Sequence, residues 1–475
     1  MADSANELTV APEVSQGLWA DIKDSVRGSH RSYTTGPIGR AILLLAIPMV
    51  LEMIMESVFA VVDIFWVSHL GTDAAATVGL TESLLTLIYA LAIGLSIGAM
   101  AMVARRIGEQ NPDGAARAAV QAIAVALIVS ITIAIIATPL APRLLALMGG
   151  SPWVVEHGVG FTRVMLACNF TVVTLFMVNA IFRGAGDAAI AMRTLWLANW
   201  INIFLGPCLI FGLGPFPKLG IVGAAIATNI GRGTGALVAL IKLFRAGGRF
   251  QIRREHLRID PALMARLVRL SGTATFQVFI GMASWIGLVR IISSFGSNAV
   301  AGYTFGIRVI LFALLPSWGM ANAAATMVGQ ALGAKDPDRA ERAVWKAGFY
   351  NMIFLGIVGI LFVVFAPQII WLYTSDPQVA QFGVDCLRIV AYGFLFYAYG
   401  MVLGQSFNGA GDTWTPTILN LFVFWLWEIP LAYVLSVVLG MGPRGVFFAI
   451  TIAFSTLAVA SALVFRRGKW KSKVV

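Results

Sequence analysis

Twelve long stretches of apolar, almost uncharged residues constrain this chain more than any other feature of its sequence. Stretches such as 41–67 and 118–140 exceed the roughly 20 apolar residues that a helix needs to cross the hydrocarbon core of a bilayer. A helix satisfies its own backbone hydrogen bonds there without water. We therefore predict an all-α polytopic membrane protein whose spans cover approximately residues 41–68, 77–103, 118–141, 159–182, 191–212, 219–244, 268–295, 302–327, 346–370, 384–405, 416–438 and 444–465.

The distribution of charge agrees with this topology. Only 12% of the residues are charged, whereas soluble domains carry about a quarter. The net charge of +11 comes from short loops and the tail, such as 245–258 and 466–473, rather than from one basic domain, which argues against a nucleic-acid partner. If the spans alternate, these basic loops share one side. The positive-inside rule then predicts a bacterial-type inner-membrane protein with both termini in the cytoplasm.

The sequence repeats itself at an offset of 225 residues. Residues 182–187, FRGAGD, recur as FNGAGD at 407–412, and the loop matches at 103–122 recur without a gap at 328–347. Each copy has six spans, so we predict two six-helix lobes related by a pseudo-twofold axis along the membrane normal, with a central cavity between them. The expected divisions are an N-terminal extension (1–37), an N-lobe (38–244), a linker (245–266), a C-lobe (267–466) and a basic tail (467–475).

Three acids lie inside the first span. An ionisable side chain in a bilayer is costly and therefore indicates function by default. Glu52, Glu56 and Asp63 are spaced to lie on one helix face within about 40° of each other. Their equivalents at the 225-residue offset are Gln277, Gly281 and Leu288. The sequence therefore predicts an asymmetric ion site in the N-lobe, centred on Asp63.

Further polar residues inside spans are candidates for the same site or for a substrate cavity. Asn179, Asn199 and Asn202 have neutral oxygens suited to a hard cation, although an Asn in a span also commonly forms a hydrogen bond that holds two helices together. Glu428 is the clearest acid of the C-lobe, and substrate contact and local pairing remain equal alternatives for it. Aromatic side chains such as Phe59 and Tyr397 would add cation–π surface to the cavity, in which we also expect Glu52, Asn199, Gln277 and Glu428.

Other classes of protein lack support in the sequence. There is no GxxxxGK[ST], HExxH or GxSxG motif, which argues against an ATP-driven pump and against an enzyme. The three cysteines include no CxxC pair, so no metal centre or cofactor is expected. With these classes set aside, we predict a secondary transporter driven by a proton or sodium gradient.

Several motifs resemble the multidrug and toxic compound extrusion (MATE) family over about residues 38–466. The similarity rests on Pro48 and Asp63 in the first span and on the repeated GAGD loops. It extends to residues 202–207, NIFLGP, and 223–228, GAAIAT. The resemblance implies a twelve-span antiporter that exports amphipathic, often cationic, organic compounds in exchange for H⁺ or Na⁺.

Residue by residue, the resemblance places the coupling cation, including Na⁺ if that is the ion, at Asp63. Asn179, Asn202 and Thr228 would surround it. Two departures favour the DinF-like branch while leaving the ion open. Gly206 replaces a second aspartate for which Glu56 would substitute, and Gln277 and Tyr397 stand where NorM-like members carry acids.

A lipid or lipid-linked saccharide flippase is the alternative function, and a membrane scaffold is the third. A flippase requires a basic cavity able to hold phosphate, against which the acids of the first span argue. The duplicated cavity makes a monomer sufficient, with small organic molecules and the lipid bilayer as the expected partners.

Overall fold

In the computed structural model, residues 18–28, 33–245 and 248–475 are described, and these contain helices and no strand. Among these residues, ten helices are long and apolar enough to cross a membrane, and two bent helix pairs bring the number to twelve if each pair is one span. The twelve predicted spans are therefore confirmed, and most helices extend beyond the predicted bounds. Of the predicted N-terminal extension, residues 1–17 and 29–32 lie outside the described residues, while α1 (Leu18–Arg27) is a short amphipathic helix.

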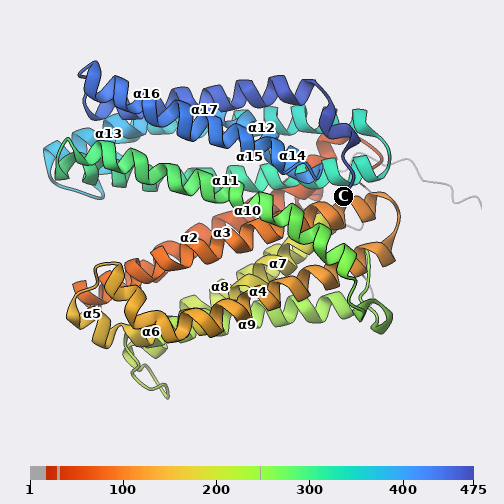
Figure 1. Ribbon diagram of the computed structural model, residues 1–475, viewed down its shortest axis with the longest axis horizontal. Coiled ribbons are helices and arrows are strands. Elements are labelled where there is room, and N and C mark those ends of the chain that lie inside the picture. Colours follow the sequence, from red (N-terminus) through yellow and green to blue (C-terminus); the bar gives the residue numbers. More distant parts are fainter. Residues whose placement is uncertain (1–17, 29–32, 246–247) are drawn as a thin grey trace, which may run out of the picture.

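Each half of the chain forms one bundle, and Figure 1 shows the two bundles side by side. We call α2–α9 the N-lobe and α10–α17 the C-lobe. The N-lobe contains α2 (Ile38–Ser68), α3 (Thr72–Gly108), α4 (Pro112–Leu147), α5 (Pro152–His157), α6 (Val159–Ala167), α7 (Asn169–Ala185), α8 (Ala188–Phe211) and α9 (Ile221–Phe244). The C-lobe contains α10 (Pro261–Ser293), α11 (Ser297–Gly333), α12 (Pro337–Trp371), α13 (Pro377–Ala391), α14 (Phe394–Gly409), α15 (Trp414–Asn420), α16 (Ile429–Tyr433) and α17 (Pro443–Arg466).

Three spans depart from a regular α-helix. Span 4 bends by 41° between α6 and α7, where the Asn169 side chain donates to the carbonyls of Ser130 and Leu166. Span 10 bends by 61° between α13 and α14. Span 11 continues from α15 through two π-helical segments, Leu421–Glu428 and Val434–Val438, on either side of α16. The length of the apolar stretches predicted these spans but not their irregularities.

The lobes converge at one end and diverge at the other (Figure 1). We call the end where the lobes converge the closed end and the end where they diverge the open end. At the closed end α3 and α11 meet through reciprocal contacts. A Cβ on Gly108 would overlap the carbonyl oxygen of Gln330, and one on Gly333 would overlap that of Arg105. These two contacts are related by the 225-residue offset, so the duplication in the sequence corresponds to a twofold-like seam. Small residues permit this close approach of the two helices.

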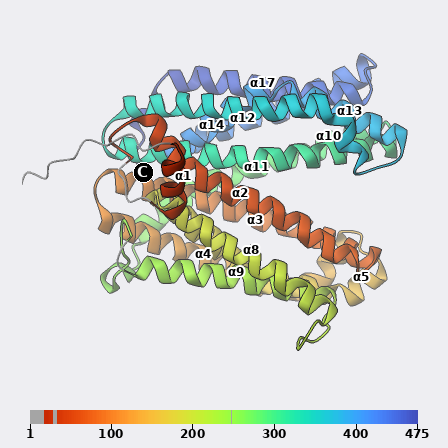
Figure 2. The same ribbon diagram turned by 180° about the vertical axis from the view of Figure 1, so that it is seen from behind.

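Both terminal segments cross the closed end, as Figure 2 shows for α1. Arg339 of the C-lobe donates to the carbonyls of Tyr33, Thr35 and Gly36, just before α2. From the N-lobe, Arg105 donates to the carbonyl of Lys473 at 2.8 Å. The interlobe segment contains a 3-10 turn, Arg254–Leu257, and ends where α10 begins at Pro261, inside the expected linker.

Candidate functional site

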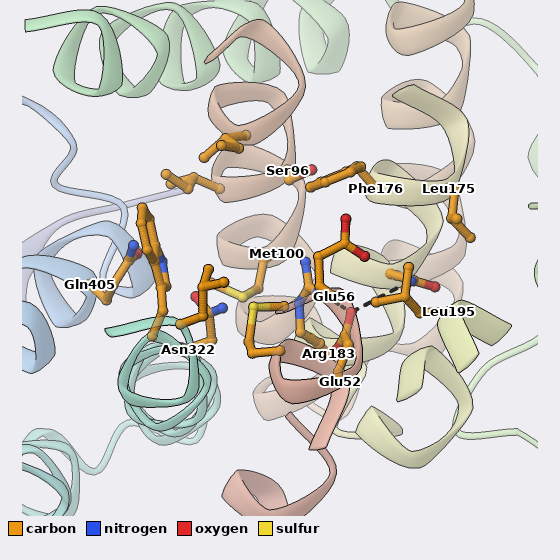
Figure 3. Close-up of a pocket in the computed structure, with 16 residues that line it drawn as sticks. Glu52, Glu56, Ser96, Met100, Leu175, Phe176, Arg183, Leu195, Asn322 and Gln405 are labelled. Carbon is orange, nitrogen blue, oxygen red and sulfur yellow. Dashed lines mark hydrogen bonds and ion pairs between the residues drawn. The ribbon is translucent and has the colours of Figure 1, made fainter. Parts of the chain in front are cut away.

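A cavity of about 220 Å³ lies between the lobes near the middle of α2. Figure 3 shows its charged wall from the N-lobe, with Glu52, Glu56 and Arg183, opposite Asn322 and Gln405 of the C-lobe. Leu315 and Trp318 of α11 also line the cavity on the C-lobe side. Residues of α3 contribute to the lining as well, namely Ile93, Ser96, Ile97 and Met100. The site is therefore an interlobe cavity whose polar groups come mainly from one lobe.

Glu52 is the centre of the first polar cluster. Its carboxylate lies 2.6 Å from the guanidinium of Arg183, and both side chains are buried. Asn179 donates to the same carboxylate at 3.5 Å and accepts a hydrogen bond from Thr194 at 3.0 Å. The second oxygen of Glu52 is buried without a hydrogen-bond partner among the described residues. Because a carboxylate has acceptor sites on both oxygens, Glu52 can accept one more donor from the cavity.

Glu56 forms a second cluster one helical turn further along α2. Its carboxylate lies 2.6 Å from Arg232 of α9 and accepts a hydrogen bond from Asn199 of α8 at 3.2 Å. The Arg232 guanidinium also lies over the Phe59 and Phe176 rings, 5.0 and 5.9 Å from their centroids. Arg232 is thus held by a charge and by two aromatic faces, which suits a guanidinium in an apolar environment.

Asp63 occupies a different position from the other two acids. Among the described residues it makes no hydrogen bond or ion pair, although it interacts electrostatically with Arg232 and with Glu82 of α3. Asn202 donates to the Thr228 hydroxyl at 2.7 Å. Asn179, which the sequence associated with Asp63, is instead paired with Glu52. The structure therefore divides the expected polar site into four parts: the Glu52 cluster, the Glu56 cluster, the Asn202–Thr228 pair, and Asp63, which has no hydrogen bond or ion pair among the described residues.

A second cavity, of about 490 Å³, lies in the C-lobe and carries no charged side chain among its lining residues. It shares Ile97, Trp318 and Gln405 with the interlobe cavity, so the two spaces adjoin. Five of its lining residues stand 225 positions after the residues that form the polar clusters of the N-lobe. The equivalents of Glu52, Glu56, Asn179, Asn199 and Arg232 are, in that order, Gln277, Gly281, Gly404, Phe424 and Leu457, all of which line it.

The expected substrate residues divide between these spaces. Glu52 lines the interlobe cavity, and Gln277 and Tyr397 line the C-lobe cavity. Phe59 and Asn199 lie behind Glu56, in contact with Arg232 and with Glu56 respectively. Glu428 lines neither cavity. It is buried in the π-helical part of span 11 and interacts electrostatically with Tyr303 and Tyr397.

Sequence reasoning missed the two basic residues that define the site. Arg183 stands near the end of span 4, in the repeated FRGAGD segment, and Arg232 lies inside span 6. The rule applied to the acids would have found Arg232, since a guanidinium well inside the sixth span is as costly as a carboxylate. In the part of the chain that the structure describes, no group of three His, Cys, Asp or Glu side chains could hold a metal.

Comparisons with known proteins agree on one family. The MatE family model matches residues 48–208 and 273–434, one match in each lobe. The chain is 26% identical over 444 residues to the "Probable multidrug resistance protein YoeA" of Bacillus subtilis, covering 92% of this chain and 95% of that protein. It is 25% identical to the "FAD transporter" of Shewanella oneidensis, covering 91% and 95% of the two chains. A solved outward-facing multidrug resistance MATE transporter is 28% identical, with a TM-score of 0.87 over 95% and 98% of the two chains.

Proposed function

Because the chain belongs to the MatE family of multi-pass membrane transporters, we propose that it is a secondary antiporter exporting small amphipathic organic compounds by alternating access. One observation carries this proposal: a charged N-lobe site and an uncharged aromatic cavity adjoin at Trp318 and Gln405. An ion and an organic molecule would then occupy neighbouring spaces. Movement of either lobe would alter both sites.

For the ion, Asp63 is the proposed coupling group. It is the acid of α2 without a hydrogen bond or ion pair among the described residues, so its charge is available to H⁺ or Na⁺. Glu52 and Glu56 already have guanidinium partners, and a cation would have to compete with these at short range. Asn202 and Thr228 would contribute neutral oxygens if the N-lobe contracts around a bound cation.

For the substrate, we propose an apolar body held in the C-lobe cavity, with contacts from Trp285, Trp318 and Tyr397. The family resemblance implies substrates that are often cationic, but two of the three acids of span 1 are neutralised by arginines, which leaves less negative charge to attract a cation. The flippase alternative is not favoured, since both arginines are held by carboxylates rather than presented to a phosphate. The substrate class therefore rests on shape and aromatic surface more than on charge.

The orientation we propose places the closed end in the cytoplasm. The closed end carries Arg105, Arg339 and the basic tail, which the positive-inside rule assigns to that side. The lobes then diverge toward the outside of a bacterial inner membrane, as in an outward-facing transporter. A monomer contains both cavities and would suffice for transport.

Ethidium efflux from loaded proteoliposomes under an imposed H⁺ or Na⁺ gradient tests this function. We expect Asp63→Asn to abolish gradient-driven efflux, and we expect Asp73→Asn to retain it, because Asp73 is an exposed acid in the first turn of α3. Unchanged efflux in Asp63→Asn would move the coupling group to Glu56 or Glu428. Absence of driven efflux from the parent protein would refute the proposed exporter function for this substrate class.

A further inference from the structure

Two opposite charges lie on different lobes, each in the half of its helix nearer the end where the lobes diverge. Glu82 lies on α3 of the N-lobe and Arg308 on α11 of the C-lobe, and both side chains are exposed. They interact electrostatically, yet within the described residues neither is within ion-pair distance of a partner. An exposed acid and an exposed base inside otherwise apolar spans are costly if they always face lipid or an empty cleft.

The two residues lie at the mouth of the C-lobe cavity. Thr86 on α3 and Leu311 on α11 both line that cavity. Glu82 is four residues before Thr86 and Arg308 is three before Leu311, so each charge lies one turn further toward the open end on nearly the same helix face. A molecule entering or leaving the cavity on this side would pass between them.

The helices that carry these charges also form the seam at the closed end, through Gly108 and Gln330. Measured along the helices from that seam, Glu82 is about 39 Å away and Arg308 about 33 Å away, at a rise of 1.5 Å per residue. The two charges therefore lie at similar depth. Rocking of the lobes that separates the closed end would bring these parts of α3 and α11 together.

The charges are complementary rather than duplicated. At the 225-residue offset the equivalents of Glu82 and Arg308 are Ile307 and Ser83. The N-lobe thus contributes a negative charge and the C-lobe a positive one. If the repeats were identical, each charge would instead be matched by a like charge on the other lobe. Unlike charges favour closure of the cleft, whereas like charges would oppose it.

We propose that Glu82 and Arg308 are gating residues that form an interlobe ion pair when the outer end closes. This inference rests on the alternating-access part of the proposed function but on neither the identity of the ion nor that of the substrate. The pair stabilises the outward-closed conformation. Reversal of either charge would leave two like charges at the point where the lobes meet.

The test is the distance between spin labels at residues 153 and 372, which lie at the open ends of the N-lobe and C-lobe, in full-length protein whose three native cysteines are replaced by alanine. We expect Glu82→Arg and Arg308→Glu each to reduce the population with the short distance by about five- to tenfold. The double reversal Glu82→Arg/Arg308→Glu should restore it to within about threefold. The control is the reversal Asp385→Arg/Arg444→Asp, which exchanges a 2.7 Å ion pair inside the C-lobe, and it should leave the distances unchanged.

Single reversals without effect, or a double reversal no better than the worse single variant, would overturn the proposal. The distances are measured without substrate or gradient. A protein that exports no ethidium but shows the charge-swap pattern would therefore contradict the proposed substrate class while supporting the gate. Cross-linking of the Glu82→Cys/Arg308→Cys variant, compared with Ser83→Cys/Arg308→Cys, provides a second measurement: a cross-link only in the first pair supports direct contact, and equal cross-linking in both opposes it.

Discussion

In the N-lobe, Glu52 and Glu56 are each bound to an arginine, whereas the same positions of the C-lobe hold Gln277 and Gly281 beside an apolar cavity. The backbone arrangement is shared, since the seam contacts at Gly108 and Gly333 are related by the repeat offset. One duplicated scaffold therefore supports two chemistries. The difference teaches that equivalent positions of the two lobes can differ in chemistry: they form buried ion pairs in the N-lobe and line an uncharged cavity in the C-lobe.

Converting the N-lobe ion pair to its C-lobe counterpart should have the largest effect. Arg183 and Glu52 correspond to Asn408 and Gln277. We expect Arg183→Asn to reduce the free energy of unfolding by about 3–5 kcal/mol, because it leaves the Glu52 carboxylate buried without its cation. The double variant Glu52→Gln/Arg183→Asn should recover most of that loss, since a neutral amide still has Asn179 beside it.

Unfolding in detergent micelles, followed by tryptophan fluorescence, measures both variants of this pair. A double variant as unstable as Arg183→Asn would mean that Arg183 acts by packing rather than by neutralising Glu52. The N-lobe fold would then require the Arg183 side chain for packing, and the two lobes could not be said to share one backbone arrangement that tolerates either chemistry.

The symmetric seam should be the next most sensitive feature. Gly108→Ala places a methyl group against the Gln330 carbonyl, and overpacking of this kind costs about 1–3 kcal/mol. We expect a lower melting temperature and a shift toward separation of the closed end, measured by labelling of a cysteine introduced there. Gly79→Ala on the same helix is the matched control, because nothing lies within 4 Å of its added Cβ. Equal effects from both alanines would assign the cost to α3 itself rather than to the seam.

Truncating the wall shared by the two cavities should affect binding rather than folding. Trp318 lines both spaces. We expect Trp318→Ala to raise the Kd for an aromatic cation such as ethidium about tenfold, equivalent to about 1.4 kcal/mol of aromatic contact. Trp414→Ala removes an exposed tryptophan that lines neither cavity and should leave the Kd unchanged. A normal Kd in Trp318→Ala would place the ligand away from this wall.

A charge at the periphery should matter least. Lys471 lies 2.6 Å from Glu341 at the closed end, and this hydrogen bond raises the pKa of the lysine. Its contribution to stability is present in full below the ordinary lysine pKa of 10.5 and is lost as the pH rises from there through the raised pKa of the folded protein. We expect Lys471→Ala to change the unfolding free energy by less than about 0.5 kcal/mol at neutral pH. A larger loss would mean that the closed end depends on charge as well as on the glycine seam.

The sequence by itself determined the twelve spans, their grouping into two repeats and the asymmetry of the acids. Each of these follows from local composition or from register: apolar length sets a span, and the 225-residue offset relates each position to its counterpart. The site residues Glu52, Glu56 and Asp63 could likewise be identified from the sequence, because a carboxylate inside an apolar stretch is recognisable without knowledge of the fold.

Tertiary structure alone decided which charges meet. Arg183 and Arg232 lie 131 and 176 residues from the acids that they neutralise, and no periodicity encodes such pairings. The bends in spans 4 and 10 and the π-helical segments also depend on neighbouring helices rather than on local propensity. The electrostatics of the site could not be read from the sequence, because the cost of a buried charge depends on its partner, and the packing of separate helices selects that partner.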